Sequence, residues 1–221
     1  MRAFFPAPHR RPRPPPRPGA RLLGAISALL VVACFASACE TEQHFFDVTG
    51  DLFVVSAADY YPQAVEKASD WRPDAYLAGI SARPAPSASI GLGPSLRYYF
   101  ESASAESEFY KVSLRHGTWS AETVPKGASS VTYPPINRED WTLDSVDAWA
   151  IAQANGGEEF LLNHQDPLTM MALSLSHERV GDREDVLVWR VWYRVGSATV
   201  YDALDMMIDP KTGDILQLET D

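Results

Sequence analysis

The spacing of hydrophobic residues after position 55 predicts two helical segments. From Ser56 to the residue before Pro73, apolar side chains recur three and four positions apart, as they do along one side of a helix, and Ser56 can cap its start. The same spacing predicts a second helix over residues 142–154, with Asp144 or Ser145 as the cap. The pair of glycines at 156–157 should end or kink that helix, and a further helical turn is expected at residues 158–163.

Other segments alternate between apolar and polar residues, which is the pattern of strands with one buried face. The predicted strands are residues 75–81, 96–100, 109–116, 118–124, 169–178, 186–195, 200–208 and 215–218. In the sixth of these, Trp189 and Trp192 have opposite parity, so they cannot both face the same core. One of them should therefore lie on the other face of the sheet, as a candidate binding residue.

The chain after residue 50 repeats one order of elements in two halves: a helix, several strands, a turn and a short last strand. Residues 125–140 separate the halves, and Pro134-Pro135 exclude a helix interior or a central strand there. The sequence therefore predicts an α+β fold with two similar helix-plus-antiparallel-sheet subdomains. Their expected limits are residues 51–128 and 142–221, joined by a linker at 129–141.

The N-terminal segment has the layout of an export signal. Residues 1–21 are rich in proline and arginine, and residues 22–38 form an uncharged apolar run that ends in small residues. Residues 1–38 are therefore predicted to be a signal peptide, and residues 39–50 a polar tether. Because 17 apolar residues are at the short limit of what spans a bilayer, a retained signal anchor is the alternative.

The end of the signal, Ala36-Ser37-Ala38-Cys39, resembles a lipobox, the sequence read by lipoprotein signal peptidase. The resemblance implies diacylglycerol on Cys39, cleavage before it, and a protein of the bacterial cell envelope that is lipid-anchored outside the cytoplasm. Residues 31–34, ending in Cys34, are a rival lipobox, and an ordinary A-x-A cleavage with simple secretion is the other alternative. Cys39 is preferred because the polar tether begins directly after it.

Charge and cysteine content narrow the possible partners. Residues 1–38 hold six arginines and no acid, which leaves 13 basic and 29 acidic residues, a net charge of −16, in the rest of the chain. An acidic domain of this kind is not expected to bind nucleic acid. Cys34 and Cys39 are the two cysteines of the sequence, so no disulfide or thiolate metal site is expected in the folded part.

The second half resembles the PepSY domain, a small helix-plus-antiparallel-sheet module found outside bacterial cells. The resemblance rests on the helix at 145–152, the strand at 188–193, and the strand and turn at 206–215. In the last of these, Asp209 and Gly213 bound an Asp-x-x-x-Gly turn and are expected to be structural. The resemblance implies protein binding or peptidase inhibition and not catalysis. The first half would be a divergent second copy.

The sequence lacks the local signatures of two common hydrolase classes: it has no G-x-S-x-G nucleophile elbow and no H-E-x-x-H pair. His164, Asp166, His177 and Glu178 could meet in space, but their spacing matches no known metal site. We therefore expect no catalytic residue, no metal and no cofactor. Trp189 and Trp192 remain the candidate binding residues, and Cys39 the lipidation site.

The resulting hypothesis is a non-enzymatic, lipid-anchored extracytoplasmic protein that binds a protein or peptide partner and could modulate a peptidase. Its contact with the membrane would be through the lipid anchor. The alternatives are an envelope hydrolase whose site the sequence does not reveal, and a structural envelope lipoprotein. The sequence makes no prediction of oligomeric state.

Overall fold

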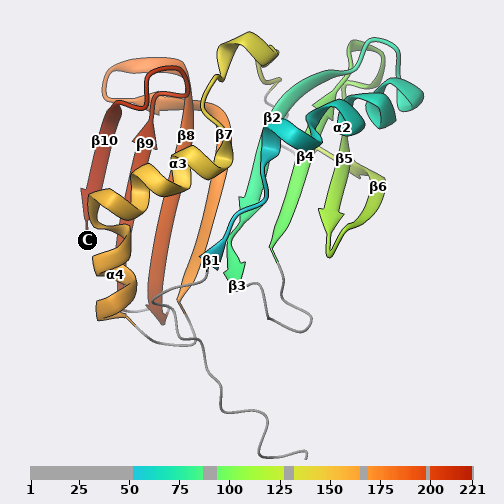
Figure 1. Cartoon of the computed structure of the whole chain (residues 1–221). Helices are drawn as coiled ribbons and strands as arrows, with labels where there is room; N and C mark the ends of the chain where they lie inside the picture. Colours follow the sequence, from blue (N-terminus) through green and yellow to red (C-terminus); the bar gives the residue numbers. More distant parts are fainter. Residues whose placement is uncertain (1–51, 87–93, 127–131, 165–168, 198–199, 221) are drawn as a thin grey trace, which may run out of the picture. The chain divides into compact units, whose positions relative to one another are not determined.

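The computed structural model describes residues 52–86, 94–126, 132–164, 169–197 and 200–220 (Figure 1). The predicted signal peptide, Cys34, Cys39 and the tether lie outside these residues. From Leu52 onward the described residues belong to one compact unit. No helix in this part of the chain has the length and apolar character needed to cross a membrane.

Helices and strands lie close to the segments that the hydrophobic pattern predicts. The helices are α2 (Ala57–Trp71), α3 (Ser145–Ala152) and α4 (Glu158–Asn163), the last two joined by a kinked turn, η3 (Gln153–Gly157), with short 3-10 turns η1 (Ala103–Ala105) and η2 (Arg138–Asp140) elsewhere. The strands are β1 (Leu52–Phe53), β2 (Tyr76–Arg83), β3 (Ala85–Pro86), β4 (Ser95–Glu101), β5 (Glu108–Arg115), β6 (Thr118–Pro125), β7 (Met170–Val180), β8 (Arg183–Ser197), β9 (Val200–Ile208) and β10 (Ile215–Thr220).

Eight strands form one antiparallel sheet in the order β10-β9-β8-β7-β2-β4-β5-β6, and β1 pairs separately with β3. The α+β class with antiparallel strands is therefore confirmed. The expected pair of subdomains is not what the structure shows. Both halves share one sheet, joined where β2 pairs with β7, and one hydrophobic core. The predicted linker contributes to that core through Ile136 and through its last residue, Trp141, which is fully buried.

One face of the sheet is covered by the helices, α2 over the strands of the first half and α3 over those of the second (Figure 1). Alanines form the contact: Ala57, Ala64 and Ala68 of α2 are buried, and α3 contributes two more. Such small side chains let a helix lie close to the large residues of the sheet. Those residues include Trp189 and Tyr193 of β8, which are fully buried on this face.

The helices α2 and α3 begin side by side and share their capping groups. The Asp144 carboxylate caps α3 by accepting a hydrogen bond from the Ser145 amide (2.7 Å), and it also accepts one from the Ala58 amide of α2 (2.9 Å). The Ser145 hydroxyl accepts a hydrogen bond from the Ala57 amide (2.9 Å) and donates one to the Val55 carbonyl (2.8 Å). Side chains of one half therefore satisfy amides that the other half's helix leaves unpaired at its start.

We expect Asp144→Ala to lower the free energy of unfolding by about 2 kcal/mol, since each lost helix cap costs about 0.5–2 kcal/mol and this residue serves two helices. Urea unfolding of the variant measures the loss. Asp70→Ala, at an exposed position near the end of α2, is the matched control and should stay within about 0.5 kcal/mol of the unmodified protein. Equal losses of unfolding free energy in the two variants would contradict the conclusion that Asp144 caps both helices.

The closing hairpin is built as its sequence predicts. The Asp209 carboxylate accepts hydrogen bonds from the amides of Lys211 (2.8 Å) and Thr212 (3.1 Å), and the Gly213 amide bonds back to the Asp209 carbonyl (3.0 Å). Gly213 has φ +81°, a conformation that favours glycine. This confirms the structural role expected of Asp209 and Gly213.

Candidate functional site

The face of the sheet opposite the helices, called here the helix-free face, carries polar and aromatic side chains. Along each strand, successive side chains point alternately to the buried face and to the helix-free face. Ser81 and Ser174 are cross-strand partners on the helix-free face, and the residues on either side of them pair on the buried face. Trp192 lies on it as well, half-buried, with the Arg194 guanidinium 5.1 Å from its ring centre. Among the described residues, the helices of the chain leave this face uncovered (Figure 1).

The two halves of the sheet separate in the middle of this face. β2 and β7 pair over Ile80–Ala82 and Leu173–Leu175 and then diverge. A bulge in β2 at Ala78 lies at the point of divergence. Beyond it the Ile136 amide donates a hydrogen bond to the Leu77 carbonyl (2.8 Å), so the segment between the halves lies beside β2 where β7 has left it. Bulges and interrupted pairing of this kind are frequent beside binding sites.

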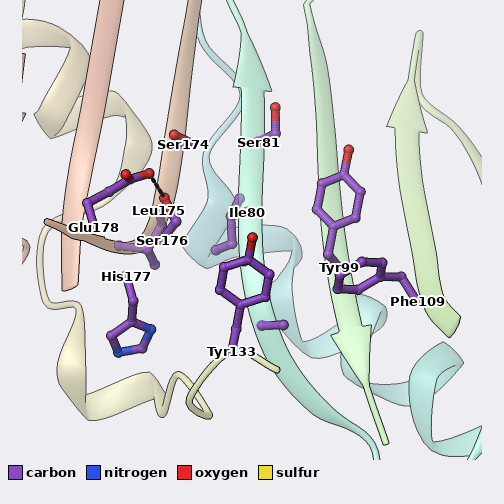
Figure 2. Close-up of a pocket in the computed structure, with 12 residues that line it drawn as sticks. Ile80, Ser81, Tyr99, Phe109, Tyr133, Ser174, Leu175, Ser176, His177 and Glu178 are labelled. Atoms are coloured by element: carbon purple, nitrogen blue, oxygen red, sulfur yellow. Dashed lines mark hydrogen bonds between the residues drawn. The ribbon is translucent and has the colours of Figure 1, made fainter. Parts of the chain in front are cut away.

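A pocket of about 380 Å³ occupies this divergence (Figure 2). Its walls come from β2, β4, β5, β7 and the segment before α3. The lining residues are Ala78, Gly79, Ile80, Ser81, Tyr99, Phe109, Tyr133, Ser174, Leu175, Ser176, His177 and Glu178. In Figure 2 the aromatic residues lie on one side of the pocket and the polar residues of β7 on the other. This volume is in the range of pockets that take a small ligand or a large side chain.

Three aromatic rings form one wall. Tyr99 and Phe109 meet edge to face with ring centres 6.3 Å apart, and Phe109 and Tyr133 lie 6.4 Å apart at an angle of 38°. Gly79 is the cross-strand partner of Tyr99. Because glycine has no side chain, the space beside the Tyr99 ring stays open to the pocket.

The opposite wall is polar and carries one carboxylate. The Ser176 hydroxyl donates a hydrogen bond to Glu178 Oε1 (2.9 Å). The guanidinium of Arg190 lies between two carboxylates. It donates hydrogen bonds to Asp205 through Nε (2.9 Å) and Nη2 (2.5 Å). Its distance to the other carboxylate is longer, with 3.8 Å between Nη1 and Glu178 Oε2. The Glu178 carboxylate therefore lines the pocket with its ion-pair partner, Arg190, beyond hydrogen-bond distance.

Behind the aromatic wall lies a buried ion pair. Lys126 Nζ is 2.7 Å from Glu101 Oε2, and their side chains are 4% and 1% exposed. The Tyr76 hydroxyl donates a hydrogen bond to the same carboxylate (3.1 Å), and burial together with that carboxylate raises the pKa of Tyr76 to about 12. Lys126 Nζ is also 5.0 Å from the Phe109 ring centre, so the ring already takes part in one cation–π contact. These contacts hold the aromatic wall in place.

His177 borders the pocket but does not form a catalytic pair with its serines. Figure 2 shows its imidazole ring pointing away from the hydroxyls of Ser174 and Ser176, as alternation along β7 requires. Its Nδ1 is buried and has no hydrogen-bond partner among the described residues. Burial lowers the pKa of His177, an effect that Asp185 and Asp140 partly offset. A general base needs hydrogen-bond reach to its nucleophile, and these positions do not provide it.

Because its pKa is lower in the folded chain than the ordinary value of 6.5, His177 should make the fold less stable in acid. Below about pH 6.5 the imidazole of His177 takes up a proton more readily in the unfolded chain than in the folded chain. The contribution of neutral His177 to the free energy of unfolding is therefore fully present above that pH and is lost as the pH falls. Between pH 7.5 and 5.0 the unmodified protein should therefore lose more unfolding free energy than His177→Gln. Urea titrations at both pH values measure this, and parallel losses would refute the assignment.

The structure separates the two tryptophans that the sequence offers as binding residues. Trp189 is fully buried, with its indole N–H donating to the Leu143 carbonyl (3.0 Å), so a partner cannot reach it. Trp192 lies on the helix-free face and stays a candidate. Cys39, the predicted lipidation site, lies outside the described residues.

The four residues considered for a metal are not gathered into one site by the described part of the chain. His164 binds Asp202 through Nε2 (2.9 Å) and the Phe160 carbonyl through Nδ1 (2.8 Å), whereas His177 and Glu178 lie at the pocket. Asp166 lies outside the described residues. Among the residues that are described, no three His, Cys, Asp or Glu side chains are placed to share a metal ion.

Sequence reasoning missed the aromatic wall. Ser174, Ser176 and Glu178 could have been placed on one face by the alternation along their strand. Tyr99 and Phe109 follow similar patterns, but nothing in the sequence shows that β2 pairs with β7 and so brings them near the serines. Tyr133, in the proline-rich segment, has no periodic signal at all.

Comparison with known proteins gives little guidance. No protein-family model matches the chain, and no curated protein matches it. A solved structure that resembles it belongs to Clostridium difficile 630 and is described as a "putative lipoprotein"; it is 15% identical, with a TM-score of 0.45, over 73% of this chain and 92% of that one. A likeness at this level assigns neither a family nor an activity.

Proposed function

We propose that this chain is a non-enzymatic, lipid-anchored protein of the bacterial cell envelope that holds a protein or peptide partner on its helix-free face. The pocket between β2 and β7 is the observation that carries the proposal. It combines an aromatic wall with serine hydroxyls and a carboxylate, which is the mixture of apolar and polar groups that ligand sites use. The signal segment and Cys39 support the location outside the cytoplasm.

The resemblance to PepSY domains is part of the same proposal. Each half contributes a helix and four antiparallel strands that are adjacent in the sheet, β2, β4, β5 and β6 in the first half and β7 to β10 in the second. In both halves a glycine with positive φ lies in the last turn, Gly117 (+70°) and Gly213 (+81°). This common order supports two related modules that have merged into one sheet, with peptidase modulation as the corresponding activity.

A hydrolase is the second candidate, because Ser174, Ser176, His177 and Glu178 all line the pocket. The orientation of His177 away from the serines argues against it. A panel of ester and peptide substrates tests the point: we expect no turnover by the full-length protein. Turnover that is lost in both Ser176→Ala and His177→Gln would replace the binding proposal with an enzymatic one.

The anchor is tested by mass spectrometry of the mature N-terminus after expression in a bacterium. We expect a chain that begins at Cys39 and carries the mass of diacylglycerol. An unmodified start at Cys39, a lipid on Cys34, or retention of residues 1–38 would each refute lipidation at Cys39.

The partner is tested by capture from envelope membranes with the anchored full-length protein, followed by quantitative mass spectrometry. Trp192→Ser removes an aromatic side chain from the helix-free face, and Leu162→Ser removes an aliphatic side chain that is 46% exposed on α4. We expect a protein whose capture falls with Trp192→Ser and is kept with Leu162→Ser. If every captured protein responds equally to the two changes, the helix-free face is not the binding surface.

A further inference from the structure

We infer that the pocket between β2 and β7 receives an arginine side chain of the partner. This inference rests on the proposed function and names the chemical group that the site would recognise. Three features carry it: an incompletely neutralised carboxylate, a wall of aromatic rings, and the acidity of the folded part of the chain. The carboxylate and the acidity favour a cationic ligand, and the aromatic wall favours one that is also partly apolar.

The carboxylate of Glu178 is the polar anchor. Its side chain is 28% exposed, and its nearest cation is Arg190 Nη1 at 3.8 Å, beyond hydrogen-bond distance. Arg190 is not free to move closer, because Asp205 holds its guanidinium through two nitrogens. Oε1 of Glu178 accepts the Ser176 hydroxyl, and among the described residues Oε2 accepts no hydrogen bond. A guanidinium that entered the pocket would supply the charged donors that this oxygen lacks.

The aromatic wall suits the rest of such a side chain. A guanidinium is planar and weakly hydrated, so it stacks on aromatic rings more readily than an ammonium group does. The rings of Tyr99 and Tyr133 both lie near that of Phe109, with ring centres 6.3 and 6.4 Å from its own. The chain itself places Lys126 Nζ 5.0 Å from the Phe109 ring centre, so this ring already contacts one cation.

The charge of the chain acts in the same direction. After residue 38 it carries 29 acidic and 13 basic residues. The resulting negative potential attracts basic segments and opposes acidic ones. An acidic or uncharged ligand would gain nothing from this field and would leave Glu178 with the distant Arg190 as its nearest cation.

The test uses the full-length protein in a neutral detergent and blocked tripeptides, acetyl-Gly-X-Gly-amide, in which X is arginine, citrulline, lysine or norleucine. Saturation-transfer NMR detects weak binding of such probes. We expect arginine to bind about tenfold more tightly than citrulline, which has the same shape without the charge, since a charge-assisted hydrogen bond is worth about this factor. Lysine should rank between them. Citrulline or norleucine binding as tightly as arginine would overturn the inference.

Variants locate the effect in the pocket. Glu178→Gln should abolish the preference for arginine over citrulline, and Tyr99→Leu should weaken arginine several-fold. Glu184→Gln, at an exposed position (73%) close to the turn between β7 and β8, is the matched control and should change neither value. An undiminished preference in Glu178→Gln would place arginine elsewhere and overturn the assignment.

The same variants separate this inference from the proposed function. If a partner captured through the helix-free face binds Glu178→Gln as tightly as the unmodified protein, the arginine assignment fails and the binding function stands. If the arginine probe behaves as expected but no partner depends on the helix-free face, the binding function fails instead.

Discussion

Replacing Lys126 with methionine should lower the free energy of unfolding by about 3–5 kcal/mol, the usual cost of removing one member of a buried ion pair. The side chain of Glu101 is 1% exposed, so without Lys126 its negative charge would be left inside the protein with two neutral donors, the Tyr76 hydroxyl (3.1 Å) and the Tyr133 amide (3.5 Å). Methionine keeps most of the volume of lysine, so the loss reports the charge rather than a cavity. Urea unfolding monitored by circular dichroism measures it.

Two further variants control this experiment. Lys111 pairs with Glu122 at the surface of β5 and β6, where their side chains are 25% and 63% exposed, so Lys111→Met should cost less than about 1 kcal/mol. The double variant Glu101→Gln with Lys126→Met removes both buried charges and should recover most of the loss. If Lys126→Met and Lys111→Met lower the free energy of unfolding equally, the conclusion that Lys126 neutralises a buried charge on Glu101 is wrong.

Trp189→Ala should be the other severe substitution, with an expected loss of about 3–5 kcal/mol, as for other large aromatic residues removed from a core. The indole is fully buried against Trp141, with ring centres 6.3 Å apart, and its N–H donates to the Leu143 carbonyl close to the start of α3. Removing it leaves a cavity between the sheet and the helix, and also leaves that carbonyl without its donor. Urea unfolding again gives the magnitude.

Trp192→Ala is the matched control, since it removes the same side chain three residues further along β8. On the helix-free face Trp192 is half-buried, so we expect its loss to cost about 1 kcal/mol, well below the cost at Trp189. Comparable losses at the two positions, or a larger loss at Trp192, would contradict the assignment of the two faces.

The parity of the two tryptophans illustrates how much of the fold could be predicted from the sequence. Period-2 alternation placed Trp189 with Val191 and Tyr193 on one face, and the structure buries all three. The caps at Ser56 and Asp144 were likewise predictable, because their side chains bond to amides close by in the sequence. Local hydrogen bonds and periodicity sufficed for these features.

Contacts between distant segments could not be predicted in the same way. The pairing of β2 with β7 joins residues more than 90 positions apart, and a single strand pattern does not name its partner. Without that pairing, two subdomains and a linker were the natural interpretation. The role of Asp144 at the start of α2 was hidden for the same reason.

The candidate site depends on those distant contacts most of all. Its aromatic wall comes from β4, β5 and the segment before α3, and its polar wall from β7. Glu178 and His177 were noticed in the sequence as conceivable metal ligands, but the structure gives them different roles. Glu178 faces the pocket, whereas alternation turns the imidazole of His177 away.

Photo-crosslinking in cells that make the full-length protein tests the binding function most directly. A benzoylphenylalanine at position 192 reports on the helix-free face, and one at position 146, where the side chain of Val146 is 43% exposed on α3, reports on the opposite side. We expect a specific crosslinked partner from position 192 that is missing from position 146. Crosslinks from position 146 alone, or no partner from position 192, would contradict a helix-free face that binds a partner.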